Sequence, residues 1–317
     1  MTDTEIPVGD RIAVGLAALG RPAYINLGRT EALPPGRDFE AMRAATYDVL
    51  DHAYGAGVRW IDVARSYGSS EEFLAGWLAD RGHADVTVSS KWGYRYVGEW
   101  KLDAPVHEVK EHTAARFAEQ WAETVDLLGK TVSLYQVHSL TVDSPLFTDD
   151  RLIGALAELA AGGVPVGFST SGPAQADAVR RAFELEVAGI PVFSAVQSTW
   201  NLLEPSVGPA LAEAHAAGKR VLVKETVANG RLVVEPPSPL ARIAREHGTG
   251  PDAVAIAAVL AQDWLPVAVI GPSSTGQLRE NLVAAKAKPT ADELAELATL
   301  AEEPSAYWRH RSCLGWR

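Results

Sequence analysis

The chain has 317 residues, of which 47% are apolar and 22% are charged. This apolar fraction is typical of a globular protein and excludes an intrinsically disordered chain. The formal net charge of −11 argues against a protein that coats a nucleic acid or an anionic membrane, because both surfaces require clustered Lys and Arg. We therefore expect neither a nucleic acid nor a membrane as a partner.

The sequence contains one cysteine, Cys313, so an internal disulfide is impossible and a cysteine-based zinc site is excluded. No other metal site is predicted. The segment Met1–Glu5 is acidic and lacks the apolar core of a signal peptide. The longest apolar run, Ala253–Ala261, is far shorter than the roughly 18 residues that a membrane helix needs. These features predict a cytoplasmic protein.

Short β-branched runs alternate with longer helical patterns along the chain. Several runs, such as Val221–Val223, are apolar at consecutive positions, as in strands that are buried on both faces. The predicted strands are Ile12–Leu16, Val58–Val63, Val86–Lys91, Ser133–His138, Val164–Ser169, Val192–Gln197, Arg220–Lys224 and Val267–Gly271. Eight strand–helix units in strict alternation favour an α/β fold, the closed (β/α)8 TIM barrel, as a single domain over residues 1–317. An open doubly wound sheet is the main alternative.

Two segments between the strands carry further predictions. Apolar residues at helical spacing predict one amphipathic helix whose buried face holds Val109, Phe117, Trp121, Val125 and Leu128. The proline-rich segment Pro236–Pro239 predicts a long loop after the seventh strand, on the face of the barrel where the strands end.

Four reactive side chains follow three successive predicted strands. Asp62 ends the second strand and Tyr67 follows it, Lys91 ends the third, and His138 ends the fourth. In a barrel these ends meet on the face that carries active sites, with neighbouring strands about 4.8 Å apart. A Lys ammonium lowers the pKa of a nearby phenol, and a carboxylate keeps that Lys charged. A neutral His can donate to a carbonyl oxygen. The set is suited to protonating an oxygen while another group attacks the adjoining carbon.

The catalytic tetrad of the aldo-keto reductases resembles three segments of this chain: Asp62-x-Ala64-x-x-Tyr67-Gly68, Ser90-Lys91 and Gln136-x-His138. The resemblance extends over roughly Ile12 to Leu300. It implies a (β/α)8 barrel and the transfer of a hydride from NADPH, or less often NADH. It also implies that Tyr67 is the general acid/base, assisted by Asp62, Lys91 and His138.

Other segments resemble the cofactor contacts of the same family. By this resemblance Ser169, Thr170 (in place of the usual Asn) and Gln197 hold the nicotinamide carboxamide. The loop after the seventh strand would cover the pyrophosphate with Gly230, Arg231 and Leu232. The adenosine-phosphate segment would comprise Gly271, Ser273, Ser274, Gln277, Glu280 and Asn281. Ser274 and Gln277 also fit a helix capping box, and such a helix start can bind an anion.

The chain departs from the family pattern at two places. Lys224 occupies the position where the family usually stacks an aromatic ring on the nicotinamide. By this resemblance Lys224 contacts the cofactor, although it is not aromatic. A cation there disfavours the positively charged oxidised ring, unless Glu225 neutralises it or Lys224 turns toward a phosphate. The stretch after the eighth strand lacks the family's frequent basic residue for the 2′-phosphate, leaving Arg231 and Arg279 as candidates. The family as a whole implies NADPH, with NADH as the alternative.

The substrate is expected to be a small carbonyl compound that meets an apolar or aromatic wall formed by Trp92, Tyr94 and Trp100, with a contribution from the C-terminal tail of about residues 301–317. The implied activity is NADPH-dependent reduction of a ketone or aldehyde, or the reverse oxidation. Two alternatives remain open, namely a nicotinamide-binding regulatory subunit that senses redox state with little turnover, and a cofactor-free barrel lyase or hydrolase. The oligomeric state is not predicted.

Overall fold

The computed structural model describes residues 11–317, so the acidic segment Met1–Glu5 lies outside the described residues. Eight parallel strands form a closed barrel in the order β1-β12-β11-β10-β7-β6-β3-β2. They are β1 (Ile12–Gly15), β2 (Trp60–Asp62), β3 (Thr87–Trp92), β6 (Val132–Leu140), β7 (Val166–Thr170), β10 (Ala195–Thr199), β11 (Arg220–Lys224) and β12 (Val267–Ile270). Each overlaps one predicted strand. The TIM-barrel prediction is therefore confirmed, and the open sheet is excluded.

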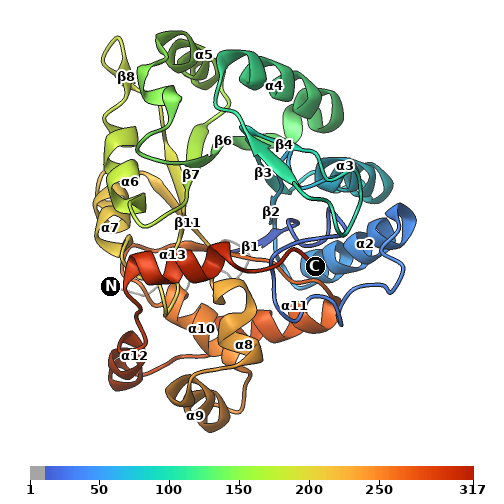
Figure 1. Ribbon diagram of the computed structural model, residues 1–317, viewed down its shortest axis with the longest axis vertical. Helices are drawn as coiled ribbons and strands as arrows, with labels where there is room; N and C mark the ends of the chain where they lie inside the picture. Colours follow the sequence, from blue (N-terminus) through green and yellow to red (C-terminus); the bar gives the residue numbers. More distant parts are fainter. Residues whose placement is uncertain (1–10) are drawn as a thin grey trace.

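Helices surround the barrel (Figure 1). They are α2 (Phe39–Gly55), α3 (Ser70–Arg81), α4 (Ala114–Leu128), α5 (Asp150–Ala161), α6 (Gln175–Phe183), α7 (Gly208–Ala216), α8 (Arg231–Val234), α9 (Ser238–Glu246), α10 (Pro251–Leu260), α11 (Thr275–Leu282), α12 (Ala291–Ala298) and α13 (Pro304–Ser312). Side-chain oxygens of Asp38, Thr113 and Asp149 cap the first turns of α2, α4 and α5. Within residues 11–317, no helix combines the length and apolarity that crossing a bilayer requires.

Smaller elements complete the fold. Single-turn 3-10 helices are η1 (Gly129–Thr131), η2 (Pro145–Thr148), η3 (Ala228–Gly230) and η4 (Val283–Ala285). Two antiparallel pairs lie outside the barrel and join β4 (Tyr94–Tyr96) to β5 (Glu108–Lys110), and β8 (Glu186–Val187) to β9 (Ile190–Pro191).

Two predictions about the connecting segments were wrong. Val109 belongs to β5, and Val125 of α4 is 39% exposed, so neither lies on a buried helix face. The buried face of α4 instead includes Gln120, which accepts a hydrogen bond from the Gly93 backbone N–H and is satisfied in the core. The segment Pro236–Pro239 is not all loop, because α9 begins at Ser238. Proline is tolerated there since the first turn of a helix leaves its N–H groups unpaired.

The barrel strands place alternate side chains inside and outside. One cluster of buried residues fills the interior, and it comprises Ala13, Trp60, Leu134, Ala195, Leu222, Val267 and Val269. Their neighbours in the strands pack outward in the main core beneath the helices. Because the period of a strand is two residues, Asp62 shares the inward side with Trp60, and Gln197 shares it with Ala195. The same alternation places the Lys224 side chain on the inward side of β11, with Leu222.

A close backbone contact fixes the loop that carries Tyr67. The Ser69 N–H donates to the Gly20 carbonyl at 2.7 Å, joining the loop after β1 to the loop after β2. A Cβ on Gly20 would lie 2.1 Å from the Tyr67 carbonyl oxygen and 2.6 Å from the Ser70 Cβ. Both loops therefore approach so closely that only glycine fits.

We predict that Gly20→Ala lowers the free energy of unfolding by about 1–3 kcal/mol or more, because the added methyl group must push the Tyr67 loop away. Urea unfolding followed by circular dichroism measures the change. Gly55→Ala is the control, since a Cβ at this helical position meets open space. Equal stability of the Gly20 and Gly55 variants would contradict the prediction.

Candidate active site

Asp62 gathers polar side chains at the end of β2. Its Oδ1 accepts hydrogen bonds from the Ser89 hydroxyl at 2.6 Å and from the Gln197 amide at 3.1 Å. Its Oδ2 accepts from the Lys91 ammonium, which also donates to the Val63 carbonyl at 3.1 Å. Asp62 and Lys91 are both buried. Burial lowers the pKa of Lys91, and Asp62 offsets part of this effect by favouring the charged form.

Tyr67 and His138 face each other beside this ion pair. The Tyr67 hydroxyl lies 3.5 Å from His138 Nε2, and the two rings meet edge to face. The Ser66 hydroxyl lies 3.3 Å from the other ring nitrogen, Nδ1. Burial, followed by the charges of Lys91 and Lys224, holds the pKa of His138 well below its usual value. The imidazole is therefore neutral. If the Ser66 hydroxyl donates to Nδ1, the ring proton is on Nε2, toward Tyr67.

Two cations flank the Tyr67 ring. The Lys91 Nζ lies 5.0 Å from the ring centroid, and the Arg21 guanidinium carbon lies 5.1 Å from it. Burial nevertheless raises the pKa of Tyr67 well above its ordinary value, although Arg21 acts to lower it. The lowering of the Tyr67 pKa that a nearby Lys91 would cause is thus outweighed, mainly by burial of the phenol and in smaller part by Tyr24 and Asp62. Tyr67 carries its proton at neutral pH.

Two hollows meet at Tyr67. The first, here called the Gln197 hollow, has an empty volume of about 610 Å³ and is lined by Asp62, Tyr67, Gln197, Lys224 and Asn229, among others. The second, the Tyr94 hollow, has an empty volume of about 780 Å³. Its lining includes Tyr67, Tyr94, His138, Lys224 and Trp316. Tyr67 lines both hollows. A ligand in either hollow therefore reaches the Tyr67 side chain.

The Gln197 hollow has features that fit a nicotinamide dinucleotide. Val269, Ile270 and Val227 give it apolar walls, and amide side chains supply polar groups. The Oδ1 atom of Asn229 is buried and has no hydrogen-bond partner in the protein. An unpaired buried acceptor is costly, and a ribose hydroxyl of a bound dinucleotide is a suitable donor for it. Ser169 and Gln197 are register partners on β7 and β10, so their side chains share the inward side, although Ser169 is fully buried and only Gln197 lines the hollow.

Comparison with known proteins agrees with this architecture. The model of the aldo/keto reductase family matches residues 35–302. The chain belongs to this family. The aldo-keto reductase str7 of Strobilurus tenacellus is 25% identical over 287 residues, covering 81% of each chain. The enzyme is thus an NAD(P)H-dependent oxidoreductase that acts on carbonyl compounds.

Solved aldo-keto reductases share the fold. The holo form of an aldo-keto reductase from Bacillus halodurans superposes with a TM-score of 0.67 at 22% identity, covering 92% of both chains. A glycerol dehydrogenase from Gluconobacter oxydans gives a TM-score of 0.68 at 20% identity, covering 92% of this chain and 90% of the other. At these identities the superpositions establish the fold and leave the substrate open.

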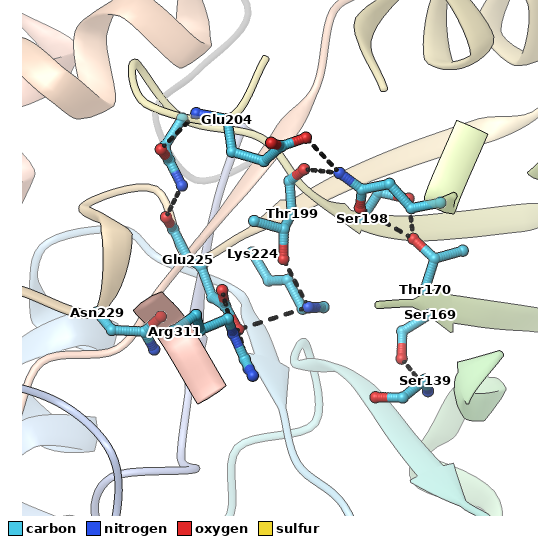
Figure 2. A network of polar contacts seen from close by, with 12 residues as sticks. Ser139, Ser169, Thr170, Ser198, Thr199, Glu204, Lys224, Glu225, Asn229 and Arg311 are labelled. Carbon is cyan, nitrogen blue, oxygen red and sulfur yellow. Dashed lines mark hydrogen bonds and ion pairs between the residues drawn. The ribbon is translucent and has the colours of Figure 1, made fainter. Parts of the chain in front are cut away.

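The strands bring together only part of the residues expected from the family. Trp92 follows Lys91 directly and therefore points to the opposite side of β3. It is fully buried against Phe117 and His112. Thr170 follows Ser169 in the same way, and its hydroxyl bonds to Ser198 at 2.6 Å outside the barrel (Figure 2). Trp92 is therefore not placed to contact a substrate, and the Thr170 side chain is not placed to hold the carboxamide.

Other expected contacts have different partners. Trp100 packs on Phe39 and Phe73 and donates to the Arg37 carbonyl at 2.9 Å, whereas Tyr94 does line its hollow. Arg231 forms an ion pair with Glu302 and is not among the residues that line the Gln197 or Tyr94 hollow. The Ser169 hydroxyl oxygen accepts the Ser139 N–H at 2.8 Å (Figure 2), which leaves its own proton free to donate.

The adenosine-phosphate segment forms the start of α11. The Ser274 hydroxyl accepts the Gln277 N–H at 3.3 Å as the N-cap, but the Gln277 side chain accepts from Ser273 rather than Ser274. This is one residue away from the predicted capping box. The segment lines a third hollow, here called the Gln277 hollow, of about 730 Å³. Its lining includes Gly230, Gly271, Ser273, Gln277, Glu280 and Asn281, whereas Leu232 is buried in a separate core cluster.

Lys224 lies between the Gln197 and Tyr94 hollows. Its ammonium donates to the Thr199 hydroxyl at 2.7 Å and lies 3.6 Å from Glu225 (Figure 2). Glu225 is bound mainly by the forked guanidinium of Arg311, and Arg311 with Lys224 outweighs burial to hold the pKa of Glu225 at about 2. Burial lowers the pKa of Lys224 to about 8. Glu225 thus compensates Lys224 only in part.

Several residues of the site were not named in the sequence-based prediction. Arg21 and Tyr24 come from the loop after β1, Glu108 from β5, and Arg311 from α13, and all line the Tyr94 hollow. Trp316 also lines it, and its segment, the C-terminal tail, was expected to contribute. Loops that follow barrel strands lie on the face of the active site, so the position of Arg21 directly after the first strand was a usable signal. Nothing in the sequence indicates that Glu108 reaches this face, and the expected contribution of the tail did not single out Arg311.

Three residues that line the Gln197 and Tyr94 hollows have left-handed backbone conformations without being glycine. The φ angles are 54° at Ser139, 57° at Glu225 and 55° at Asn229. Such conformations cost energy and occur often at functional sites. Within residues 11–317, no group of three His, Cys, Asp or Glu side chains is placed to hold a metal ion.

We predict that Lys224→Met changes the pH dependence of stability. The pKa of Lys224 is about 8 in the folded protein, against an ordinary value of 10.5. Between these values the unfolded chain binds more protons, so stability rises with pH. The variant lacks this contribution. Urea unfolding at about pH 7.5 and about pH 9.5 should show the wild type gaining stability relative to the variant. The exposed Lys130→Met serves as the control, and parallel pH profiles for all three proteins would contradict the prediction.

Proposed function

We propose that the protein reduces a ketone or aldehyde to an alcohol, or catalyses the reverse oxidation, with Tyr67 as the proton donor. The observation that carries this proposal is the pairing of the Tyr67 hydroxyl with His138 Nε2 at 3.5 Å, where the two hollows meet. A carbonyl oxygen between these groups would receive hydrogen bonds from both. Donors aimed at the oxygen that gains charge stabilise the transition state.

Each residue of the tetrad has a distinct role in this reaction. The bound nicotinamide cofactor supplies the hydride. Tyr67, whose raised pKa keeps it protonated, gives its proton to the substrate oxygen. The neutral His138 orients the oxygen through Nε2–H. Lys91 and Arg21, each about 5 Å from the ring centroid, stabilise the phenolate that remains. Asp62 holds Lys91 in place.

The nicotinamide end of the cofactor is proposed to bind in the Gln197 hollow. Gln197, which lines the hollow, and Ser169, its register partner, would hold the carboxamide through an amide group and a hydroxyl proton. Asn229 would accept from a ribose hydroxyl. The rest of the cofactor would pass Gly271, which lines both the Gln197 hollow and the Gln277 hollow. Gly230 lines the Gln277 hollow and would lie beside this path. NADPH is the family's general choice and NADH the alternative.

The substrate is proposed to occupy the Tyr94 hollow. The aromatic rings of Tyr24, Tyr94 and Trp316 form part of its wall, which agrees with the expected aromatic character. The rest of the wall is charged, because Arg21 pairs with Glu108, and Arg311 pairs with Glu225. Residues 301–317 contribute Arg311, Leu314 and Trp316, so the tail would select the substrate. A small carbonyl compound with polar substituents suits this wall better than a purely apolar one.

The alternative function, a redox-sensing subunit with little turnover, is favoured by one observation. Lys224 places a cation in the Gln197 hollow, where it would weaken binding of the oxidised nicotinamide ring relative to the reduced one. Such a difference in affinity is what a sensor needs. The Tyr67–His138 arrangement has no evident purpose in a sensor, so we favour the enzyme.

We predict that Tyr67→Phe lowers the rate of carbonyl reduction by roughly 100- to 10,000-fold, because the proton donor is lost while the ring remains. Turnover is followed by the absorbance of the reduced cofactor with a reactive aromatic aldehyde, and cofactor binding is measured separately by calorimetry. Binding should be retained.

Tyr54→Phe is the matched control, since this tyrosine bonds to Asp85 away from both hollows and its loss should leave turnover unchanged. Full activity of the Tyr67 variant would overturn the proposed mechanism. Tight cofactor binding by the wild type without turnover on a broad panel of aldehydes and ketones would favour the sensor.

A further inference from the structure

The Gln277 hollow continues the Gln197 hollow. The two share Asn26, Thr226, Val227 and Gly271 in their linings. A ligand whose nicotinamide lies beside Gln197 would therefore extend over Gly271 to the start of α11. If the proposed function holds, the adenosine half of the dinucleotide occupies the Gln277 hollow. The charges of that hollow then decide which form of the cofactor binds.

Two carboxylates line the Gln277 hollow. Asp252 lies in the first turn of α10, and Glu280 lies on the exposed side of α11. The Asn281 amide donates to Asp252 at 2.6 Å, which uses a donor that a ligand phosphate would otherwise meet. Gln277 is also occupied, since its side chain bonds to the Ser273 N–H and the Gly28 carbonyl.

Among the residues that line this hollow, all within the described part of the chain, Arg29 is the single basic side chain. Its Nε donates to the Ala18 carbonyl at 2.9 Å, and one terminal nitrogen donates to the carbonyls of Pro22 and Arg317, each at 2.8 Å. The other terminal nitrogen donates to the carbonyls of Ala18 and Arg21. A guanidinium has five N–H donors, so none is left for a phosphate. The side chain is 1% exposed.

The two other candidate cations, Arg231 and Arg279, do not line the Gln277 hollow. Arg231 is held by Glu302. Arg279 lies on α11, but Ser273, Gln277, Glu280 and Asn281 define the face of that segment that lines the hollow. Arg279 follows Gln277 by two residues, which is about 200° around a helix, so it projects from another face.

We infer that the adenosine end of this site accepts an unphosphorylated ribose, so the enzyme prefers NADH and NAD⁺ to NADPH and NADP⁺. A 2′-phosphate carries close to two negative charges at neutral pH and needs a cation or several free N–H donors. Here it would meet Asp252 and Glu280. A free ribose hydroxyl, in contrast, can donate to the Glu280 carboxylate. This preference departs from the NADPH that the family resemblance implies.

The test is equilibrium binding of NADH and NADPH to the full-length protein by isothermal titration calorimetry, which needs no substrate. We expect NADH to bind at least about tenfold more tightly. Glu280→Gln should narrow this ratio, because it removes a negative charge from the exposed surface without disturbing the core. Ser273→Arg adds a cation to the hollow and should narrow the ratio further or reverse it.

Arg279→Gln is the matched control on the same helix. It should leave the ratio of the two affinities unchanged. If it weakens NADPH binding selectively, then Arg279 binds the 2′-phosphate and the inference fails. Equal or tighter binding of NADPH by the wild type also overturns the inference, but leaves the proposed reductase function intact. Binding of neither dinucleotide overturns both.

Discussion

The carboxylate of Asp62 connects strands that lie far apart around the barrel. It belongs to β2 and accepts hydrogen bonds from Ser89 and Lys91 on β3 and from Gln197 on β10. β10 is four strands from β2 in the closed order, so the bond to Gln197 crosses the interior. A buried carboxylate must be matched by a cation or by several donors. Asp62 has both, and the position of Lys91 beside the Tyr67 ring follows from this requirement.

The strand pattern allowed much of the fold and site to be predicted. Buried parallel strands are apolar on both faces, so they are recognisable as short β-branched runs, and all eight overlap with observed strands. The polar residues at their ends marked the tetrad. The same property hid the direction of each side chain, because a strand that is apolar on both faces shows no alternation. The period of two residues would have supplied this direction, because residues two apart share a side of the strand. Trp92 is one residue from Lys91, and Thr170 is one residue from Ser169. Both therefore point outward and could have been excluded from the site.

The charged wall of the Tyr94 hollow could not be predicted from the sequence. Arg21 and Glu108 are 87 residues apart, and Arg311 and Glu225 are 86 apart, and each pair meets because distant segments of the chain converge on one face. Local patterns carry no information about such pairs, because the two partners lie in different segments. The hydrogen bonds that use all the donors of Arg29 could not be predicted for the same reason, since the backbone carbonyls that accept them come from separate segments. The cofactor preference that we infer therefore depends on tertiary contacts that the family resemblance does not describe.

Ser139, Glu225 and Asn229 have left-handed backbone conformations, which lower the stability of the fold while they shape the site. Each such conformation costs about 1–3 kcal/mol, which the surrounding structure must supply. Glycine at any of these positions would relieve the strain, and it would also free a segment next to His138 or in the β11–α8 connection to move. Selection for heat resistance and selection for a rigid binding surface would therefore favour different residues at the same three places. A more heat-resistant relative that keeps this rigid surface would have to gain its stability elsewhere in the barrel.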